Sequence, residues 1–131
     1  MTTRLYLIRH GETALSAADC FSGASEAELS AEGRRQANCL AQRLAALPIV
    51  AFYCSPLGRA RATATIVAAP HALTPVVVPD LRELDYGQWE TLPREEVTAR
   101  FAADYAAWGV DPLASAPPGG ETGLDVLARV L

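Results

Sequence analysis

The sequence predicts an α/β fold, a three-layer α/β/α sandwich with a mostly parallel sheet and helices on both faces. Three short apolar runs, residues 5–8, 49–54 and 73–79, have the length and composition of buried strands. Helical patterns lie between these runs, as the connections of a parallel sheet require. Because 131 residues suffice for one hydrophobic core, we expect residues 1–131 to form a single domain.

The overall charge narrows the range of partners. Eleven basic and 15 acidic residues leave a net charge of −4, which disfavours nucleic acids and anionic membrane surfaces. No apolar run approaches the length of a bilayer span. We therefore expect no nucleic-acid partner and no membrane partner. A small anionic substrate is still compatible with the sequence, because a local arginine cluster is enough to bind it.

The cysteines indicate a reducing compartment. Cys20, Cys39 and Cys54 are odd in number and lack the Cys-x-x-Cys spacing, which disfavours a disulfide scaffold and a zinc site. We expect a cytoplasmic protein without metal or cofactor. The sequence leaves the oligomeric state open, a homodimer included.

The end of the first apolar run carries the residues of greatest chemical interest. Ligands of open α/β sheets bind beyond the carboxyl ends of the strands, and Arg9, His10 and Gly11 follow residues 5–8 directly. Arg9 offers a permanent cation, and His10 offers a ring nitrogen that can attack or carry a proton. The aperiodic residues 14–27 are expected to form a loop over this strand end.

The second apolar run ends in a similar way. Ser55 can cap the helix that follows, and Arg59 lies in the first turns of that helix. Arg59 can therefore point at the same pocket as Arg9, although an arginine on a helix surface is the commoner outcome. Arg61 is expected at the surface, and His71 in an exposed loop.

A candidate general acid follows the third run. A carboxylate held among Tyr86 and Trp89 would have a raised pKa, because partial desolvation favours its neutral form. Glu83, Asp85 and Glu90 all lie in this stretch, and loop capping or surface charge is the alternative role of Asp85 and Glu90.

Helical patterns complete the chain. The pattern that Ser30 caps runs to Pro48 and is expected to be scaffold, and a second one runs from Thr91 to about Trp108. The aromatic stripe of the second pattern is more often a packing face than a cofactor site.

Four motifs in order resemble the histidine phosphatase superfamily, also called the phosphoglycerate mutase-like family. They are Arg-His-Gly-Glu-Thr at residues 9–13, the serine–proline turn with arginine at 55–64, the glutamate–aromatic stretch at 82–90 and Gly-Gly-Glu-Thr at 119–122. The resemblance implies a phosphoglycerate mutase-like fold. It also implies a phosphomonoester hydrolase acting on a small phosphorylated metabolite.

The resemblance also implies roles for individual residues. His10 would be phosphorylated during turnover, Arg9 and Arg59 would hold the phosphoryl group, and Glu83 would donate the proton to the leaving group. The implied substrate- and phosphate-binding residues are Arg9, Arg59, Thr13, Ser16, Ser22 and Gly23. Relatives usually carry asparagine where this chain has Ser16 and arginine where it has Cys20, so its substrate preference is open.

Within the family, the short gap between the glutamate and double-glycine motifs favours a phosphatase over a phosphoglycerate mutase, which is the alternative. Trp108 and Asp111-Pro112 ahead of residues 117–121 look like the α-ribazole phosphatases of cobalamin biosynthesis. In the family the next element is a strand ending in His-Gly, with a second pocket histidine, which this sequence lacks. We therefore expect a domain incomplete at its C-terminus, with a catalytically impaired phosphate-binding or interaction module as the further alternative.

Overall fold

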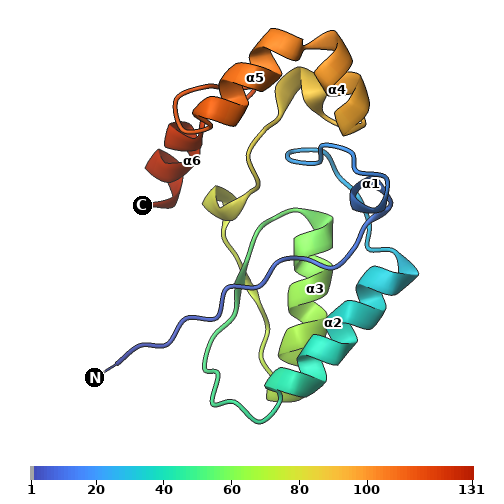
Figure 1. Cartoon of the computed structure of the whole chain (residues 1–131). Coiled ribbons are helices and arrows are strands. Elements are labelled where there is room, and N and C mark those ends of the chain that lie inside the picture. Colours follow the sequence, from blue (N-terminus) through green and yellow to red (C-terminus); the bar gives the residue numbers. More distant parts are fainter. Residues whose placement is uncertain (1) are drawn as a thin grey trace.

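The computed structural model describes residues 2–131 (Figure 1). The helices are α1 (Ala14–Ala17), α2 (Ala31–Leu44), α3 (Gly58–Ala68), α4 (Arg94–Arg100), α5 (Ala102–Val110) and α6 (Gly123–Val130). The strands are β1 (Tyr53–Cys54) and β2 (Val76–Val77), and short 3-10 turns span Ala69–His71, Pro79–Leu81 and Gly87–Trp89.

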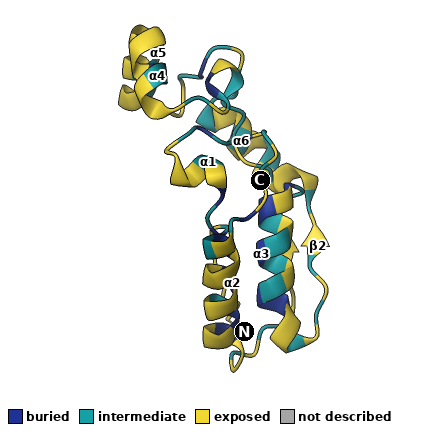
Figure 2. Cartoon of the chain, turned by 90° about the vertical axis from the view of Figure 1, so that its right-hand side faces the viewer, coloured by how far each residue is buried: buried dark blue, intermediate teal, exposed yellow. Residues whose placement is uncertain are grey.

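The sheet of the described residues consists of β1 and β2 in parallel. Tyr53 pairs with Val76 and Cys54 with Val77, and α3 forms the crossover between the two strands. The predicted second and third strands are thus confirmed in place, although each is shorter than its apolar run. Helices α2 and α3 pack side by side next to this sheet (Figures 1 and 2).

The prediction of a buried first strand at residues 5–8 is wrong for the described structure. The segment is extended, but it has no ladder partner within residues 2–131, and Leu5 and Leu7 are 79% and 95% exposed. An apolar run becomes a strand only where a neighbouring segment offers free amides and carbonyls. The expected loop at residues 14–27 also begins with a short helix, α1, which Thr13 caps.

Two of the expected helices form for the reasons that the sequence indicates, with different ends. The Ser30 hydroxyl accepts a hydrogen bond from Gly33 N at 3.0 Å and starts α2 as expected. Helix α3 starts at Gly58 instead of after Ser55, whose predicted cap is wrong. The Ser55 hydroxyl instead accepts from Leu57 N at 3.3 Å within the preceding turn.

Residues 91–108 form two helices instead of one, because the backbone of Phe101 leaves the helical conformation (φ −125°, ψ 39°). Both helices face an aromatic core. The buried members are Phe21, Trp89 and Val97, and Tyr86, Leu92, Phe101, Tyr105 and Trp108 pack against them. The aromatic stripe is therefore a packing face, as expected.

A glycine pair brings the chain around His10 close to α2. A Cβ atom on Gly11 would lie 2.4 Å from Gly33 O, and one on Gly33 would lie 2.1 Å from Glu12 O. The backbones can approach this closely only without side chains. Gly11 N also donates to the Thr63 hydroxyl at 3.1 Å, which ties the same segment to α3.

Gly33→Ala is expected to lower the free energy of unfolding by about 2 kcal/mol, measured by urea denaturation. Helix propensity alone favours alanine by about 1 kcal/mol, but the clash with backbone atoms outweighs that gain. Gly109→Ala in α5 is the matched control, because nothing lies within 4 Å of its added methyl group. It should stabilise the protein by about 0.5 kcal/mol. Equal effects of the two changes would contradict the close approach.

Candidate active site

His10 lies at an open depression of about 320 Å³. The depression is lined by Arg9, His10, Gly11, Glu12, Ser16 and Gln36. The Nδ1 atom of His10 lies 2.7 Å from Gly11 O. Since a carbonyl oxygen can only accept, Nδ1 carries the hydrogen, and Nε2 of the neutral ring keeps a lone pair. The ring is therefore oriented with one nitrogen available to a ligand.

Charged groups from three parts of the chain surround the imidazole. Burial lowers the pKa of His10, the Gly11 carbonyl raises it, and the cations Arg59 and Arg9 lower it further, while Glu83 raises it slightly. The net pKa lies below the ordinary 6.5, so the ring is neutral at neutral pH. Arg9 lines the depression beside His10, and Arg59 and Glu83 lie near enough for their charges to act on the ring.

Arg59 is buried, with 1% of its surface exposed, so the alternative of a helix-surface arginine is wrong. Its Nη1 donates to Ser25 O at 2.7 Å, and its Nη2 donates to Ser22 O at 3.1 Å and Gly23 O at 2.7 Å. The buried Nε atom finds no hydrogen-bond partner within residues 2–131. The guanidinium therefore holds a loop through its two Nη atoms.

Glu90 holds the other side of that loop, residues 22–25, which we call the clamped loop. Its carboxylate accepts from the amides of Gly23, Ala24 and Ser25 at 2.8–3.2 Å and from the Ser25 hydroxyl at 2.5 Å. It also accepts from Tyr86 N at 3.0 Å. The capping role considered for Glu90 is confirmed, and it extends to a distant loop.

The remaining predicted binding residues differ in how exposed they are and in whether their polar groups have a hydrogen-bond partner. Thr13 is fully buried, and its hydroxyl accepts from Ser16 N at 3.1 Å. Ser16 is exposed and lines the depression. Gly23 packs so tightly that a Cβ atom would lie 1.8 Å from Leu84 O, and the buried Ser22 hydroxyl has no partner within residues 2–131.

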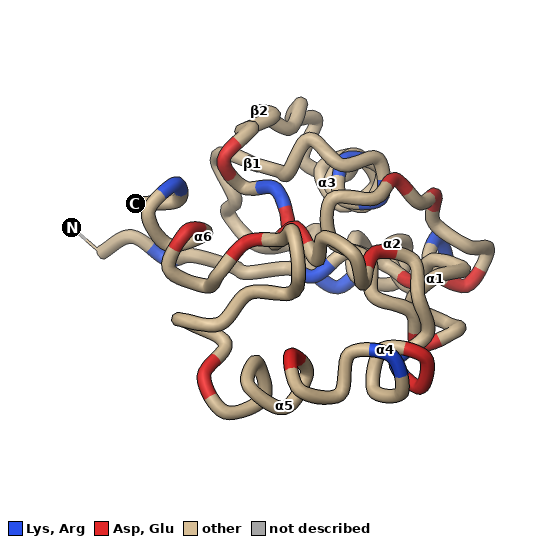
Figure 3. Tube along the Cα trace, turned by 90° about the horizontal axis from the view of Figure 1, so that it is seen from above, with Lys and Arg blue, Asp and Glu red and all other residues tan. Residues whose placement is uncertain are grey.

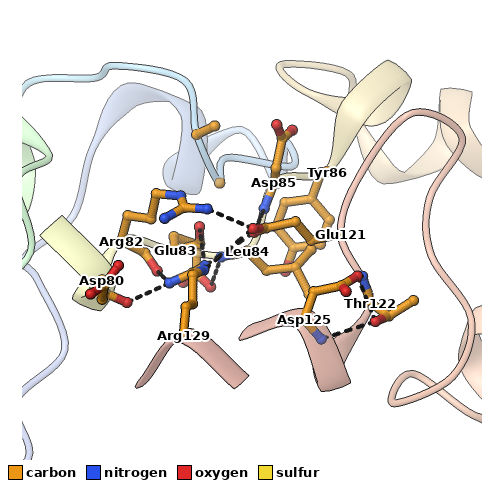
Figure 4. A network of polar contacts seen from close by, with 12 residues as sticks. Asp80, Arg82, Glu83, Leu84, Asp85, Tyr86, Glu121, Thr122, Asp125 and Arg129 are labelled. Carbon is orange, nitrogen blue, oxygen red and sulfur yellow. Dashed lines mark hydrogen bonds and ion pairs between the residues drawn. The ribbon is translucent and has the colours of Figure 1, made fainter. Parts of the chain in front are cut away.

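Glu83 does not lie in the apolar surroundings that the sequence predicted. The residue is exposed, and its carboxylate accepts from Leu84 N at 2.8 Å. The nearby aromatic rings turn toward Phe21 and the core instead. Its segment is held by Arg129 and Glu121, whose role the sequence did not reveal (Figure 4).

The structure also locates His71 and the charged residues of the helices. His71 is half-buried rather than exposed, with its ring 5.4 Å from that of Phe52. Basic and acidic residues are spread over α2, α4 and α6 alike (Figure 3).

Within residues 2–131 no group of three or more His, Cys, Asp or Glu side chains is arranged to hold a metal ion. No helix in the same range is long and apolar enough to cross a membrane.

The fold and the site together define an α/β protein with a histidine and two arginines at a loop cluster. The model of the histidine phosphatase superfamily (branch 1) matches residues 5–131. The chain belongs to this superfamily.

Individual relatives agree with this assignment. The chain is 36% identical over 118 residues to the adenosylcobalamin/alpha-ribazole phosphatase of Salmonella typhimurium, covering 90% of this chain and 58% of the relative. The alpha-ribazole phosphatase of Shigella flexneri matches with a TM-score of 0.84 and 32% identity, covering 94% and 61%. A mycobacterial glucosyl-3-phosphoglycerate phosphatase in complex with VO3 matches with a TM-score of 0.86 and 33% identity, covering 92% and 59%.

These likenesses confirm the predicted family and the α/β fold class of phosphoglycerate mutase type. The chain spans about three fifths of the length of each of these three relatives.

Glu90→Gln is expected to lower the free energy of unfolding by about 2 kcal/mol at neutral pH, because an amide cannot accept all of the hydrogen bonds that the carboxylate accepts. Burial raises the pKa of Glu90, but bonds from Ser25, Tyr86, Gly23 and Ala24 outweigh it and hold the pKa below 4.5. The stabilisation is therefore present above pH 4.5 and lost as the pH falls through the lowered pKa.

Urea titrations of both proteins from neutral pH to about pH 3 measure this difference. Glu95→Gln, at an exposed position in the first turn of α4, is the control and should change stability by less than about 0.5 kcal/mol. A gap between wild type and Glu90→Gln that stays constant with pH would contradict the role of the charge.

Proposed function

We propose that this chain is a single-domain phosphomonoester hydrolase that acts through a phosphohistidine on a small phosphorylated metabolite. The proposal rests on the environment of the His10 imidazole. Its Nδ1 donates a hydrogen bond to Gly11 O, and the charges of Arg9, Arg59 and Glu83 act on the ring. This arrangement has a neutral nucleophile, cations for an anionic group and a proton donor.

In the first step, Nε2 of His10 attacks phosphorus, so that an N–P bond forms as the P–O bond to the leaving group breaks. Arg9 lines the depression and stabilises the charge on the phosphoryl oxygens, and the buried guanidinium of Arg59 adds positive charge nearby. Glu83 acts as the general acid and gives a proton to the leaving oxygen. The Gly11 carbonyl stabilises the ring while it carries positive charge, because Nδ1–H donates to it.

In the second step, water attacks the phosphohistidine and the Glu83 carboxylate takes its proton. The N–P bond breaks, its electron pair returns to Nε2, and inorganic phosphate leaves. Glu83 regains its proton, so both residues return to their starting states. The exposure of Glu83 suits this exchange, because the carboxylate meets both leaving group and water.

The cellular setting belongs to the same proposal. The three cysteines are free, which is typical of proteins in a reducing compartment, and we place the protein in the cytoplasm.

Trapping tests the covalent step. Incubation with a phosphate ester radiolabelled on phosphorus, followed by rapid denaturation, should give an acid-labile, base-stable label that His10→Ala abolishes. His71→Ala is the matched control and should keep the label, because His71 packs on Phe52 in a different part of the chain. An unlabelled wild type that still binds phosphate would favour the phosphate-binding module instead. Label in His10→Ala would remove His10 as the nucleophile.

We further propose α-ribazole phosphate as the substrate, supported by the relatives named alpha-ribazole phosphatase. The value of kcat/KM for α-ribazole phosphate should exceed that for 3-phosphoglycerate by at least about tenfold, since one well-placed set of contacts contributes 1–3 kcal/mol. Steady-state release of inorganic phosphate measures both. Equal or lower rates on α-ribazole phosphate would remove this substrate. Conversion of 3-phosphoglycerate into its 2-isomer would favour the mutase alternative.

A further inference from the structure

Arg129, in the last turn of α6, binds the backbone on both sides of the predicted proton donor (Figure 4). Its Nη1 donates to Asp80 O at 2.5 Å and to Arg82 O at 2.8 Å, and its Nη2 donates to Glu83 O at 3.2 Å. Its side chain is only 11% exposed. A largely buried guanidinium with this set of acceptors holds a backbone segment in one conformation.

Glu121 completes the cluster from the double-glycine motif. Its carboxylate accepts from Nε and Nη2 of Arg129 at 3.3 and 3.1 Å, from Arg82 Nη2 at 2.8 Å and from Asp85 N at 3.0 Å. The bond from Arg129 lowers the pKa of Glu121, burial opposes this, and the bond from Asp85 lowers it further. All five N–H donors of Arg129 therefore have an acceptor.

The cluster does more than attach α6 to the molecule. Three large apolar residues of α6 are about half exposed, namely Leu124 (52%), Leu127 (48%) and Val130 (46%), and the helix has no fully buried residue. Polar contacts connect Arg129 of this helix and the neighbouring Glu121 to residues 80–85. Glu83 itself is exposed, and its side chain bonds only to the adjacent Leu84 N within residues 2–131. The position of its carboxylate therefore depends on how rigid its backbone is.

We propose that Arg129, held by Glu121, is a positioning residue that orients Glu83 for proton transfer to the leaving group. This inference rests on the proposed hydrolase function and concerns its proton-transfer step. A misplaced acid matters only when the leaving oxygen needs a proton. Loss of Arg129 should therefore change the dependence of the rate on the leaving group, not simply the amount of folded protein.

Two esters separate these effects. In p-nitrophenyl phosphate the leaving group departs as a stable anion, whereas in glycerol 3-phosphate it is an alkoxide that requires protonation. Arg129→Gln should lower kcat/KM about tenfold for glycerol 3-phosphate and less than about twofold for p-nitrophenyl phosphate, as expected for partial loss of general acid catalysis. Arg129→Lys, which keeps the charge on a single donor atom, should change the rates in the same direction.

Two reference variants make the result interpretable. Glu83→Gln should show the same selectivity for the ester with a larger loss. Arg100→Gln is the matched control, because Arg100 also lies in the last turn of its helix and pairs with a glutamate, Glu96. It should leave both rates unchanged.

The outcomes are distinct. An equal loss on both esters in Arg129→Gln, with selective loss in Glu83→Gln, would overturn the positioning role alone. A Glu83→Gln variant without selectivity would overturn the proposed role of Glu83, and with it the inference. If no ester is hydrolysed, hydrogen exchange at Asp85 N, which donates to Glu121, still tests whether Arg129 and Glu121 hold residues 80–85. Exchange should be about tenfold faster in Arg129→Gln than in Arg100→Gln, and equal exchange would overturn the positioning role.

Discussion

The buried guanidinium of Arg59 and the clamped loop that it binds support the rest of the site. Burying a permanent charge is costly unless its donors find acceptors, and the loop supplies three carbonyl oxygens. The same loop would leave its amides unsatisfied without the Glu90 carboxylate. Cation and anion thus stabilise opposite edges of one loop, and each depends on the other through its backbone.

This arrangement links the chemistry to the two hydrophobic regions of the molecule. Arg59 belongs to α3, which packs on α2, and Glu90 follows Trp89, the fully buried centre of the aromatic core. The clamped loop is therefore the place where the α2–α3 layer and the aromatic layer are held together. Gly11, next to His10, contacts Gly33 of α2 and Thr63 of α3, so the imidazole is attached to the α2–α3 layer.

Departures from the family pattern fall on one side of the site. Ser16, at a position where relatives usually carry asparagine, is exposed at the depression beside His10. Cys20, where they usually carry arginine, is half-buried, and its backbone pairs with Pro93. Ser16 lies in α1 and Cys20 follows that helix, so both departures fall in the segment after Thr13. Arg9, His10 and Arg59 keep the residue types of the family pattern.

Local patterns in the sequence predicted much of the site and of the helices. The caps of α2, the apolar spacing of the aromatic stripe and the short motifs around His10, Arg59 and Glu83 are properties of neighbouring residues, so they can be recognised without a structure. Two strand predictions held for the same reason. The first strand failed because pairing requires a partner, and residues 5–8 find none within residues 2–131.

The sequence by itself determined the family, helices α2 and α3, strands β1 and β2, and the set of candidate site residues. Only the tertiary structure decided that Arg59 is buried, that Glu90 holds a loop 65 to 67 residues away, and that Arg129 binds the backbone around Glu83. The physical reason is that these are long-range hydrogen bonds to backbone groups. Every residue except proline offers the same amide and carbonyl, so no side-chain pattern shows which of them a distant charged group will bind.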